Sequence, residues 1–251
     1  MFYGIPPEKL EDFRRAVDTL ASVYPGMIYA NDMLITFSRN LSFRFDEHFM
    51  KCYDSSAQTN TERSKLWRWH VLTWAAQNAL NVEGDFVECG VNRGFSVQVL
   101  CMYLGFQDLP RRYYLYDTFS GLPEQTSTEE ERKKYSNYSA RDSEAWYREV
   151  CERFAAYSNV RIVRGVVPYS FQEAVPEKIA FLHIDMNTEK AEMLALEHLF
   201  DSVSPGGMIV LDDFGWIGHA NQCKAELAFM RERGHSVLEL PTGQGLILKH
   251  A

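Results

Sequence analysis

The sequence has few cysteines, and none is placed to build a disulfide framework or a structural metal site. Its 251 residues include five, Cys52, Cys89, Cys101, Cys151 and Cys223, and no two of them form a C-x-x-C pair. An odd number of cysteines without such spacing is typical of a reducing compartment. We therefore expect no disulfides, no structural zinc and a cytoplasmic location.

Apolar runs of membrane-spanning length and an excess of positive charge are missing too. Runs such as 179–182 and 208–211 are far shorter than the roughly 20 residues that a bilayer requires, and residues 1–9 lack a signal-peptide pattern. Lys and Arg number 26 against 34 Asp and Glu, for a formal net charge of −8. Nucleic-acid binding requires a basic surface. We therefore expect neither membrane nor nucleic-acid partners and a small ligand, although acidity of this size also serves solubility alone.

Hydrophobic periodicity separates a first region from the rest of the chain. Leu10, Phe13 and Val17 belong to a helical stripe within residues 8–23, and residues 62–81 show a second helical pattern. We expect residues 1–82 to form a helical extension that covers an acceptor or mediates oligomerisation.

From Gly84 onward, short strands alternate with helices. Strands are predicted for 85–89, 113–116, 160–163, 179–184 and 208–211, and helices for 96–104, 142–156 and 189–203. Such alternation is typical of a parallel sheet covered on both faces. Two last strands, 236–240 and 245–249, are only four residues apart, so they must be antiparallel. The expected class is α/β, with a mostly parallel sheet in residues 83–251 and a reversed strand at its end.

The first strand ends in a turn that lacks the third glycine of a dinucleotide-binding site. Residues 88–94 read E-C-G-V-N-R-G, with glycines only at Gly90 and Gly94. Glu88 would repel a pyrophosphate at this strand end and attract a cationic ligand. Asp117 ends the next strand 23 residues after Gly94, a spacing that suits a carboxylate on a ribose diol. S-adenosylmethionine, a nucleoside with positive charge, fits both acids; the alternative is a plain turn with solvated acids.

The turn resembles a motif of the macrocin-type sugar O-methyltransferases. Three further motifs follow in that family's order: Y-D-T-F-S-G-L-P (116–123), L-H-I-D (182–185) and S-P-G-G-M-I-V-L-D-D-F-G (204–215). The similarity extends over roughly 83–249 and, more loosely, over the helix before it. It implies a Rossmann-like class I methyltransferase fold that uses S-adenosylmethionine and typically Mg²⁺.

The resemblance also implies which residues contact the cofactor. Around the first three strands and at the fourth strand end, these are Glu88, Cys89, Gly90, Gly94, Phe95, Ser96, Asp117, Thr118, Phe119, Gly165, Val166 and Asp185. Of these, Gly165 and Val166 would border the adenine.

Three carboxylates are predicted to meet at one edge of the sheet. Asp185 ends the fourth strand, Asp212 and Asp213 follow the fifth, and a parallel crossover places both ends at the same edge. Three anions there would repel one another without a cation. Oxygen ligands favour a hard ion, Mg²⁺ first, with Ca²⁺ or Mn²⁺ as alternatives. Helix N-capping is the competing explanation, but it accounts for one aspartate at a time and not for the adjacent pair.

One departure from the family concerns the catalytic base. Many relatives have an acid two residues past the fourth-strand aspartate, often regarded as the base, where this chain has Asn187. An amide can bind a substrate or a metal, but it cannot take a proton at neutral pH. The catalytic candidates are therefore Asp185, Asn187 and His219, with Asp185, His219 or a metal-bound water as the base. His183 is expected to be a hydrogen-bonded core residue.

The resulting hypothesis is Mg²⁺-dependent methyl transfer from S-adenosylmethionine to a hydroxyl of a sugar or another small, glycosylated or polyhydroxylated natural product, by a homo-oligomer. A binding module without turnover and an N-methyltransferase remain as alternatives, and a nicotinamide-dependent dehydrogenase fits less well. The charged stretch 124–134 is expected to be a mobile surface loop, or else a lid. Trp67, Trp69 and Trp74 are expected in the core.

Overall fold

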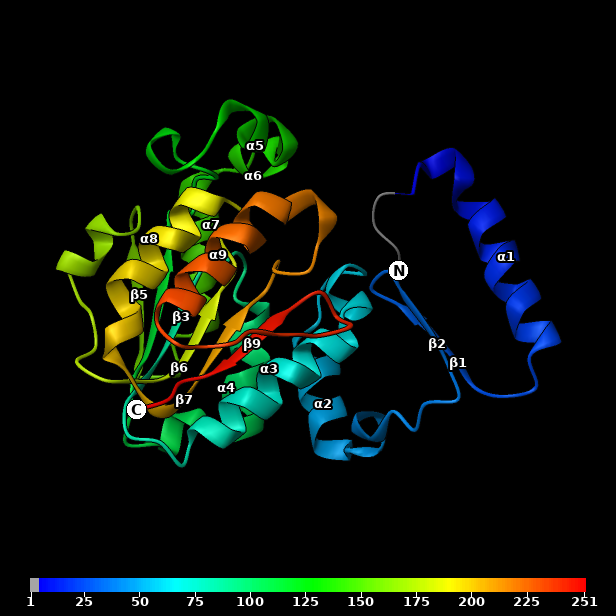
Figure 1. Cartoon of the computed structure of the whole chain (residues 1–251), viewed down its shortest axis with the longest axis horizontal. Helices are drawn as coiled ribbons and strands as arrows, with labels where there is room; N and C mark the ends of the chain where they lie inside the picture. Colours follow the sequence, from blue (N-terminus) through cyan, green and yellow to red (C-terminus); the bar gives the residue numbers. More distant parts are fainter. Residues whose placement is uncertain (1–4) are drawn as a thin grey trace. The chain divides into compact units, whose positions relative to one another are not determined.

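The computed structural model describes residues 5–251, and the chain divides into two compact units, Met1–Val71 and Leu72–Ala251 (Figure 1). The division falls within helix α3 (Leu66–Ala79). Among the described residues, no helix has both the length and the apolar character needed to cross a membrane.

The first unit combines helices with a β-hairpin. Helix α1 (Leu10–Val23), preceded by the short 3-10 helix η1 (Pro7–Lys9), confirms the predicted first helix, and α2 (Glu47–Ser56) follows the hairpin. The hairpin consists of β1 (Ile28–Asn31) and β2 (Leu34–Phe37), which pair antiparallel. The hairpin was not predicted, so the extension is helical only in part.

The turn of this hairpin lacks the residues from which a hairpin is usually predicted. Its two central residues, Asp32 and Met33, have φ of 49° and 61°, a left-handed geometry that is usually formed by Asn-Gly or Asp-Gly. Here no glycine is present. A buried ion pair holds the turn instead, because Arg68 Nε and Nη2 donate to the two Asp32 oxygens at 3.0 and 3.1 Å.

The tryptophans of α3 differ in their surroundings. Trp69 is buried as expected, and Trp67 packs edge-on against Tyr29. Trp74 is 45% exposed, so its assignment to the core was wrong.

The second unit is built on a seven-stranded sheet with the order β5-β4-β3-β6-β7-β9-β8. Its parallel strands are β3 (Asp85–Cys89), β4 (Tyr113–Asp117), β5 (Val160–Arg164), β6 (Ile179–Ile184) and β7 (Val203–Leu211). The antiparallel hairpin β8 (Leu238–Glu239) and β9 (Gly245–Leu248) joins the sheet through β9 at β7. The predicted α/β class and reversed last strand are confirmed.

Two predicted boundaries around β7 were wrong. The preceding helix α8 (Glu189–Leu199) ends earlier than expected and passes into η7 (Phe200–Ser202). Strand β7 begins at Val203 instead of Met208, because Val203 pairs with Ile179 across an irregular register. The glycines at 206 and 207 hide this early segment from a hydrophobic pattern.

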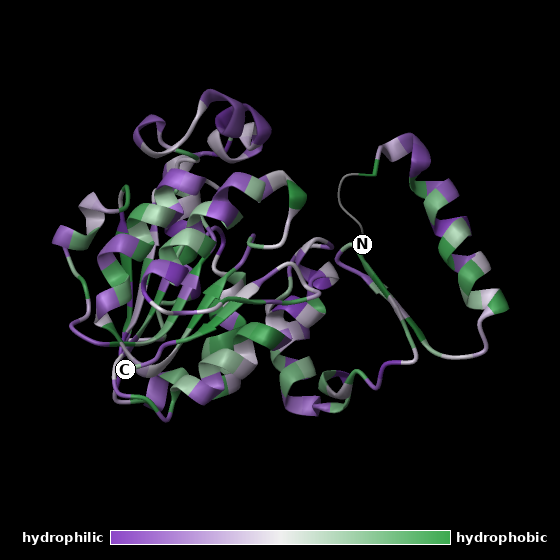
Figure 2. Cartoon of the chain, in the orientation of Figure 1, coloured by the Kyte–Doolittle hydropathy of each residue, from purple (hydrophilic) through white to green (hydrophobic). Residues whose placement is uncertain are grey.

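Helices cover both faces of the sheet. Helix α4 (Phe95–Leu104) lies on one face, and α8 and α9 (Ala220–Glu232) lie together on the other (Figure 1). The strands between them are largely hydrophobic in Figure 2, and side chains such as Val87, Leu182 and Ile209 are fully buried. Burial on both faces explains the continuous apolar runs from which the sheet was predicted.

The stretch 124–134 is ordered and partly helical, so its prediction as a mobile loop was wrong. It forms η5 (Glu124–Thr126) and α5 (Glu129–Lys134), followed by α6 (Ser136–Ser139) and α7 (Ser143–Arg153). Thr128 and Glu131 form a reciprocal capping box at the start of α5. Its three acids fill the first turn and its three bases the last, which complements the helix dipole. The dense charges therefore stabilise a helix.

Candidate active site

Strands β3 and β6 are neighbours at the centre of the sheet. From this pair the chain adds β4 and β5 on one side and β7 on the other, so the strand order reverses between β3 and β6. In α/β sheets, ligands bind at such a switch point, beyond the carboxyl ends of the strands. The amide of Asp185 donates to Cys89 O at 2.8 Å, so the two strand ends are directly linked. Gly90 has φ of +91°, and a Cβ there would collide with the carbonyl oxygen of Asp185. Only glycine permits this close approach.

Asp117, at the end of β4, holds the glycine-rich turn in place. Its Oδ2 accepts from the amides of Val91 and Asn92, and its Oδ1 from the amide of Phe119, each at 2.8 Å. Burial raises the pKa of Asp117, and these amide donors oppose the shift without cancelling it. A carboxylate has about four acceptor positions. The amide of Thr118 also acts on this carboxylate, so backbone donors occupy most of these positions.

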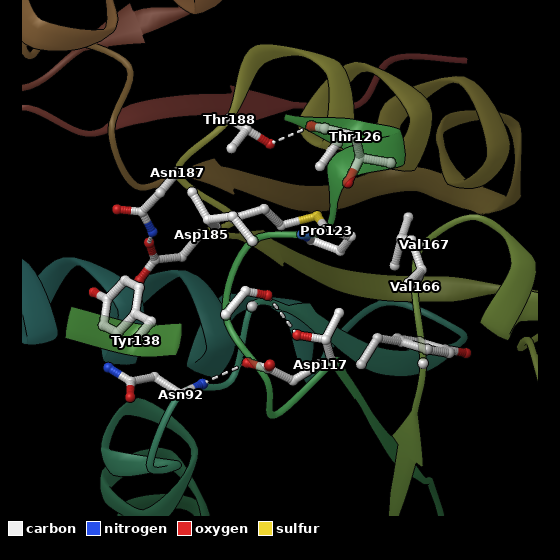
Figure 3. A pocket seen from close by; sticks show the side chains of 18 of the residues that line it. Asn92, Asp117, Pro123, Thr126, Tyr138, Val166, Val167, Asp185, Asn187 and Thr188 are labelled. Atoms are coloured by element: carbon white, nitrogen blue, oxygen red, sulfur yellow. Dashed lines mark hydrogen bonds between the residues drawn. The ribbon is translucent and has the colours of Figure 1, made fainter. Parts of the chain in front are cut away.

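A cavity opens at these strand ends, with about 80 Å³ of space that a water-sized sphere can enter. Six of the twelve predicted cofactor residues line it: Gly90, Asp117, Thr118, Gly165, Val166 and Asp185. Figure 3 shows that Asp185 and Asn187 lie on one side of this cavity, and Val166 and Val167 lie on the opposite side. We call it the first cavity.

The other six predicted cofactor residues do not line the first cavity: Glu88, Cys89, Gly94, Phe95, Ser96 and Phe119. Cys89 and Phe95 are buried, and Gly94 starts α4 in a left-handed conformation. Phe119 packs against Trp146 and Tyr147. These residues lie behind the residues that line the cavity.

Glu88 is fully buried within the sheet and surrounded by donors. It accepts from Ser96 Oγ at 2.6 Å and Tyr113 Oη at 3.2 Å, and it lies 2.9 Å from His183 Nδ1. Burial alone would lower the pKa of His183, but the charges and hydrogen bonds of Glu88 and Asp212 raise it to about 10. Glu88 thus stabilises an imidazolium inside the protein. His183 is the hydrogen-bonded core histidine that the sequence predicted.

One wall of the first cavity comes from the segment after β4, and the sequence reading missed it. Tyr138 and Trp146 line the cavity together with Asn92. Trp146 Nε1 donates to Asn92 O at 2.7 Å, and Arg141 Nη1 donates to Asn92 Oδ1 at 2.6 Å. The Arg141 guanidinium also stacks over both aromatic rings. The only local signal was the aromatic content of this segment, which is also typical of a core.

The acidic cluster forms partly as predicted. Ligand atoms of His183, Asp185 and Asp212 lie within 4.8 Å of one another. Asp212 is 1% exposed and accepts from Gln244 Nε2 at 3.0 Å. Asp213 lies outside this group, with Oδ2 3.7 Å from His219 Nε2. Two carboxylates at one strand edge fit a hard divalent cation. His183 fits less well, because its raised pKa favours the protonated ring.

Asn187 occupies a strained turn directly after β6. Its φ is +62°, and its amide and that of Met186 both donate to Glu192 Oε1, at 3.0 and 2.9 Å. Its side chain donates to Asp185 Oδ1 at 3.0 Å. The turn therefore holds the Asn187 side chain beside the strand-end carboxylate.

His219 does not line the first cavity. It belongs to the 3-10 helix η8 (Ile217–His219), and its Nε2 lies 2.7 Å from Tyr135 Oη and 3.2 Å from Lys134 Nζ. It lines a second cavity of about 350 Å³, formed by α5, η8 and the start of α9. Asn187 lines both cavities, so the two spaces meet at the end of β6.

Comparisons with known proteins give one consistent result. Residues 51–237 match the family model of macrocin O-methyltransferase (TylF). A relative from Streptomyces olivaceus, 8-demethyl-8-(2,3-dimethoxy-alpha-L-rhamnosyl)-tetracenomycin-C 4'-O-methyltransferase, is 28% identical over 209 residues, or 79% of this chain and 78% of the relative. The mycinamicin III 3''-O-methyltransferase of Micromonospora griseorubida is 28% identical over 158 residues, or 59% of this chain and 62% of the relative.

A solved structure supports the fold. The O-methyltransferase NovP superposes with a TM-score of 0.62 and 22% identity, over 74% of this chain and 81% of NovP. The model match covers most of the chain and agrees with the motifs quoted above. The chain therefore belongs to the macrocin O-methyltransferase family and is an S-adenosylmethionine-dependent O-methyltransferase.

Proposed function

We propose that this enzyme binds S-adenosylmethionine in the first cavity and methylates a hydroxyl of a sugar-bearing or polyhydroxylated natural product in the second cavity. The observation that carries the proposal is the position of Asn187, which lines both cavities and donates to Asp185. Methyl transfer requires donor and acceptor to meet in line, and the end of β6 is where the two spaces meet. The acceptors named for the two relatives, a rhamnosyl-tetracenomycin and mycinamicin III, support the acceptor class.

The orientation of the cofactor follows from the two sides of the first cavity. Asp117 lines the cavity as the carboxylate for a ribose hydroxyl, and Gly165 and Val166 supply an apolar border for the adenine. Asp185 and Asn187 lie on the opposite side from Val166 (Figure 3). The methyl-bearing end of the cofactor would then face these two residues.

Asp185 and Asp212 would hold a divalent metal, Mg²⁺ in the first instance. Their carboxylates lie within 4.8 Å of each other, and carboxylate oxygens are the ligands that Mg²⁺ prefers. When bound, such a cation supplies Lewis-acid polarisation of the acceptor hydroxyl. Asp213, next to Asp212, would complete the acidic edge and lies near His219.

His219 is the base that we favour. Asn187 cannot take a proton, and Asp185 already accepts the Asn187 amide. His219 lines the second cavity, and its Nε2 is the ring atom that faces Tyr135 and Lys134 at the cavity wall. Once the acceptor hydroxyl takes the place of one of these two neighbours, the Nε2 lone pair can accept its proton as the methyl is transferred.

The first unit and the compartment complete the proposal. Exposed apolar side chains at Val23, Met27 and Met33 suit a surface that contacts the acceptor or a second copy in a homo-oligomer. We retain residues 1–82 as the extension that serves this purpose, with residues 83–251 as the methyltransferase domain. The five free cysteines support a cytoplasmic location.

A product assay tests the proposal. The enzyme is incubated with labelled S-adenosylmethionine and a panel of glycosides, with EDTA and with EDTA plus excess Mg²⁺. We expect a methylated glycoside whose formation stops in EDTA and returns with Mg²⁺. Full activity in EDTA would contradict the metal, and product only from amines would indicate N-methylation. Cofactor binding without product from any acceptor would indicate a binding module.

A further inference from the structure

A fully buried carboxyl group links the Asn187 turn to His219. Glu192 of α8 is 0% exposed, and its Oε1 accepts from the amides of Met186 and Asn187. Its Oε2 accepts from Gln222 Nε2 of α9 at 2.8 Å. Gln222 is 2% exposed, and its Oε1 lies 3.2 Å from His219 Nδ1. Glu192 thus contacts the Asn187 turn directly and is connected to His219 through Gln222.

The neighbours of His219 Nε2 determine which ring nitrogen carries the proton. Lys134 Nζ lies 3.2 Å from His219 Nε2, and an ammonium group has donors only. Nε2 must therefore present its lone pair, so the neutral ring carries its hydrogen on Nδ1. The Tyr135 hydroxyl, at 2.7 Å, can donate to the same lone pair.

The neighbour of His219 Nδ1 agrees with this assignment. A hydrogen on Nδ1 requires an acceptor, and Gln222 Oε1 is the atom within reach. The amide nitrogen of Gln222 then points at Glu192 Oε2, which accepts it. Donors and acceptors alternate without conflict along Lys134, His219, Gln222 and Glu192. The orientation of one amide therefore connects a buried carboxyl to the tautomer of a histidine in the second cavity.

We propose that Glu192 is a positioning residue for methyl transfer, which acts through Gln222 to hold His219 with its proton on Nδ1 and its Nε2 lone pair toward the acceptor. The inference rests on the proposed role of His219 as base. The Glu192 carboxyl also anchors the Asn187 turn. It therefore positions both the proposed base and the end of β6, where the two cavities meet. Because Glu192 lines neither the first nor the second cavity, it would contact neither substrate.

Glu192→Gln is the sharpest test, because it changes donors and acceptors without changing shape. The new amide keeps an oxygen for the Met186 and Asn187 amides, so its NH2 group takes the place of Oε2, which faces Gln222 and has Glu226 as a further neighbour. Two NH2 groups cannot bond each other, and Gln222 must turn its oxygen toward position 192. Its NH2 then faces His219 Nδ1 and favours the opposite tautomer, with the proton on Nε2.

The tautomer is read directly by ¹⁵N NMR of histidine-labelled protein, with the His219 signals assigned from His219→Gln. We expect wild-type shifts of the Nδ1–H form and a change toward the Nε2–H form in Glu192→Gln. The kcat should fall about tenfold or more, while the KM for S-adenosylmethionine stays within about twofold. Glu197→Gln, the same substitution at an exposed position of α8, is the matched control and should leave both readouts unchanged.

Gln222→Met provides a second variant if Glu192→Gln folds poorly. It breaks the link to His219 but leaves the Glu192 bonds to the Asn187 turn, so mixed tautomers and a smaller loss of kcat are expected. Unchanged tautomer shifts in both variants would overturn the proposal. A changed tautomer with wild-type kcat, where His219→Gln is inactive, would also overturn it. If His219→Gln retains full kcat, the proposed base is wrong, and the NMR result still decides whether Glu192 sets the tautomer.

Discussion

Glu88 at the end of β3 and Asp212 just past β7 are both buried acids at the carboxyl edge of the same sheet, with exposures of 0% and 1%. Glu88 is surrounded by donors, the hydroxyls of Ser96 and Tyr113 and the ring of His183. Asp212 accepts from Gln244 and lies near the same His183, but it also has a second carboxylate, Asp185, beside it. Donors satisfy a buried carboxylate, whereas a neighbouring acid raises its energy until a cation is added. The neighbours, more than the strand end itself, separate a structural acid from a candidate metal ligand.

The largest effect is expected for Asp212→Asn. The amide keeps an oxygen for Gln244 but removes the charge that would hold a metal, so kcat should fall at least about a hundredfold, or ~3 kcal/mol. Binding of S-adenosylhomocysteine, measured by calorimetry, should change by less than about threefold. Asp201→Asn, an exposed counterpart, should have no effect on either quantity. If Asp212→Asn retains its kcat, Asp212 does not hold a metal that catalysis needs, and the proposed difference between Glu88 and Asp212 is wrong.

Glu88→Gln should show the reverse pattern. The substitution removes the charge that stabilises protonated His183, so the free energy of unfolding should fall by about 2 kcal/mol. Glu88 does not line the first cavity, and cofactor affinity of the folded fraction should change little. Urea unfolding and calorimetry measure the two quantities. A large loss of cofactor affinity at unchanged stability would show that Glu88 contacts the ligand after all.

A third buried acid, Glu226 of α9, can be compared with these two, and its expected effect on stability is smaller. Burial raises the pKa of Glu226 from 4.5 to about 7, beside Glu192. Between these two pH values the unfolded chain releases a proton that the folded chain retains. Stability is therefore fully present below pH 4.5, declines as the pH rises to about 7 and stays lower above it.

Glu226→Gln removes this titration. The variant should be more stable than the wild type at pH 8, by about 1 kcal/mol, and the difference should shrink toward zero at pH 5. Urea unfolding at the two pH values gives the comparison. A variant that is less stable at pH 8 would indicate that the Glu226 charge is itself stabilising.

Short-range patterns were enough to predict the second unit. The apolar runs of β3 and β6 and the glycine turn between β3 and α4 gave the correct strand type and the correct ligand edge, because backbone hydrogen bonding and φ preferences are local. Local patterns failed at Asp32 and Met33, where an ion pair with Arg68 replaces the usual turn glycine. They were also misread at α5, where a capping box and ordered charges were present in the sequence.

The candidate site was predicted only in part, for a related reason. Asp117 and Asp185 follow strands, so their strand ends place them at the cavity whatever their neighbours are. Tyr138 and Trp146 lie in the segment between β4 and β5, and no hydrophobic periodicity predicts the path of that segment. Both line the cavity, where Trp146 contacts Asn92.

The sequence by itself determined the sheet, the order of its motifs and the family, because hydrophobic period, turn chemistry and motif spacing are properties of neighbouring residues. Tertiary structure alone decided the partners of the buried polar groups. His183 meets Glu88 across 95 residues of sequence, and Lys134 meets His219 across 85. Whether a buried acid or a histidine is structural, metal-binding or catalytic depends on donors and acceptors that only the folded chain brings within hydrogen-bond distance.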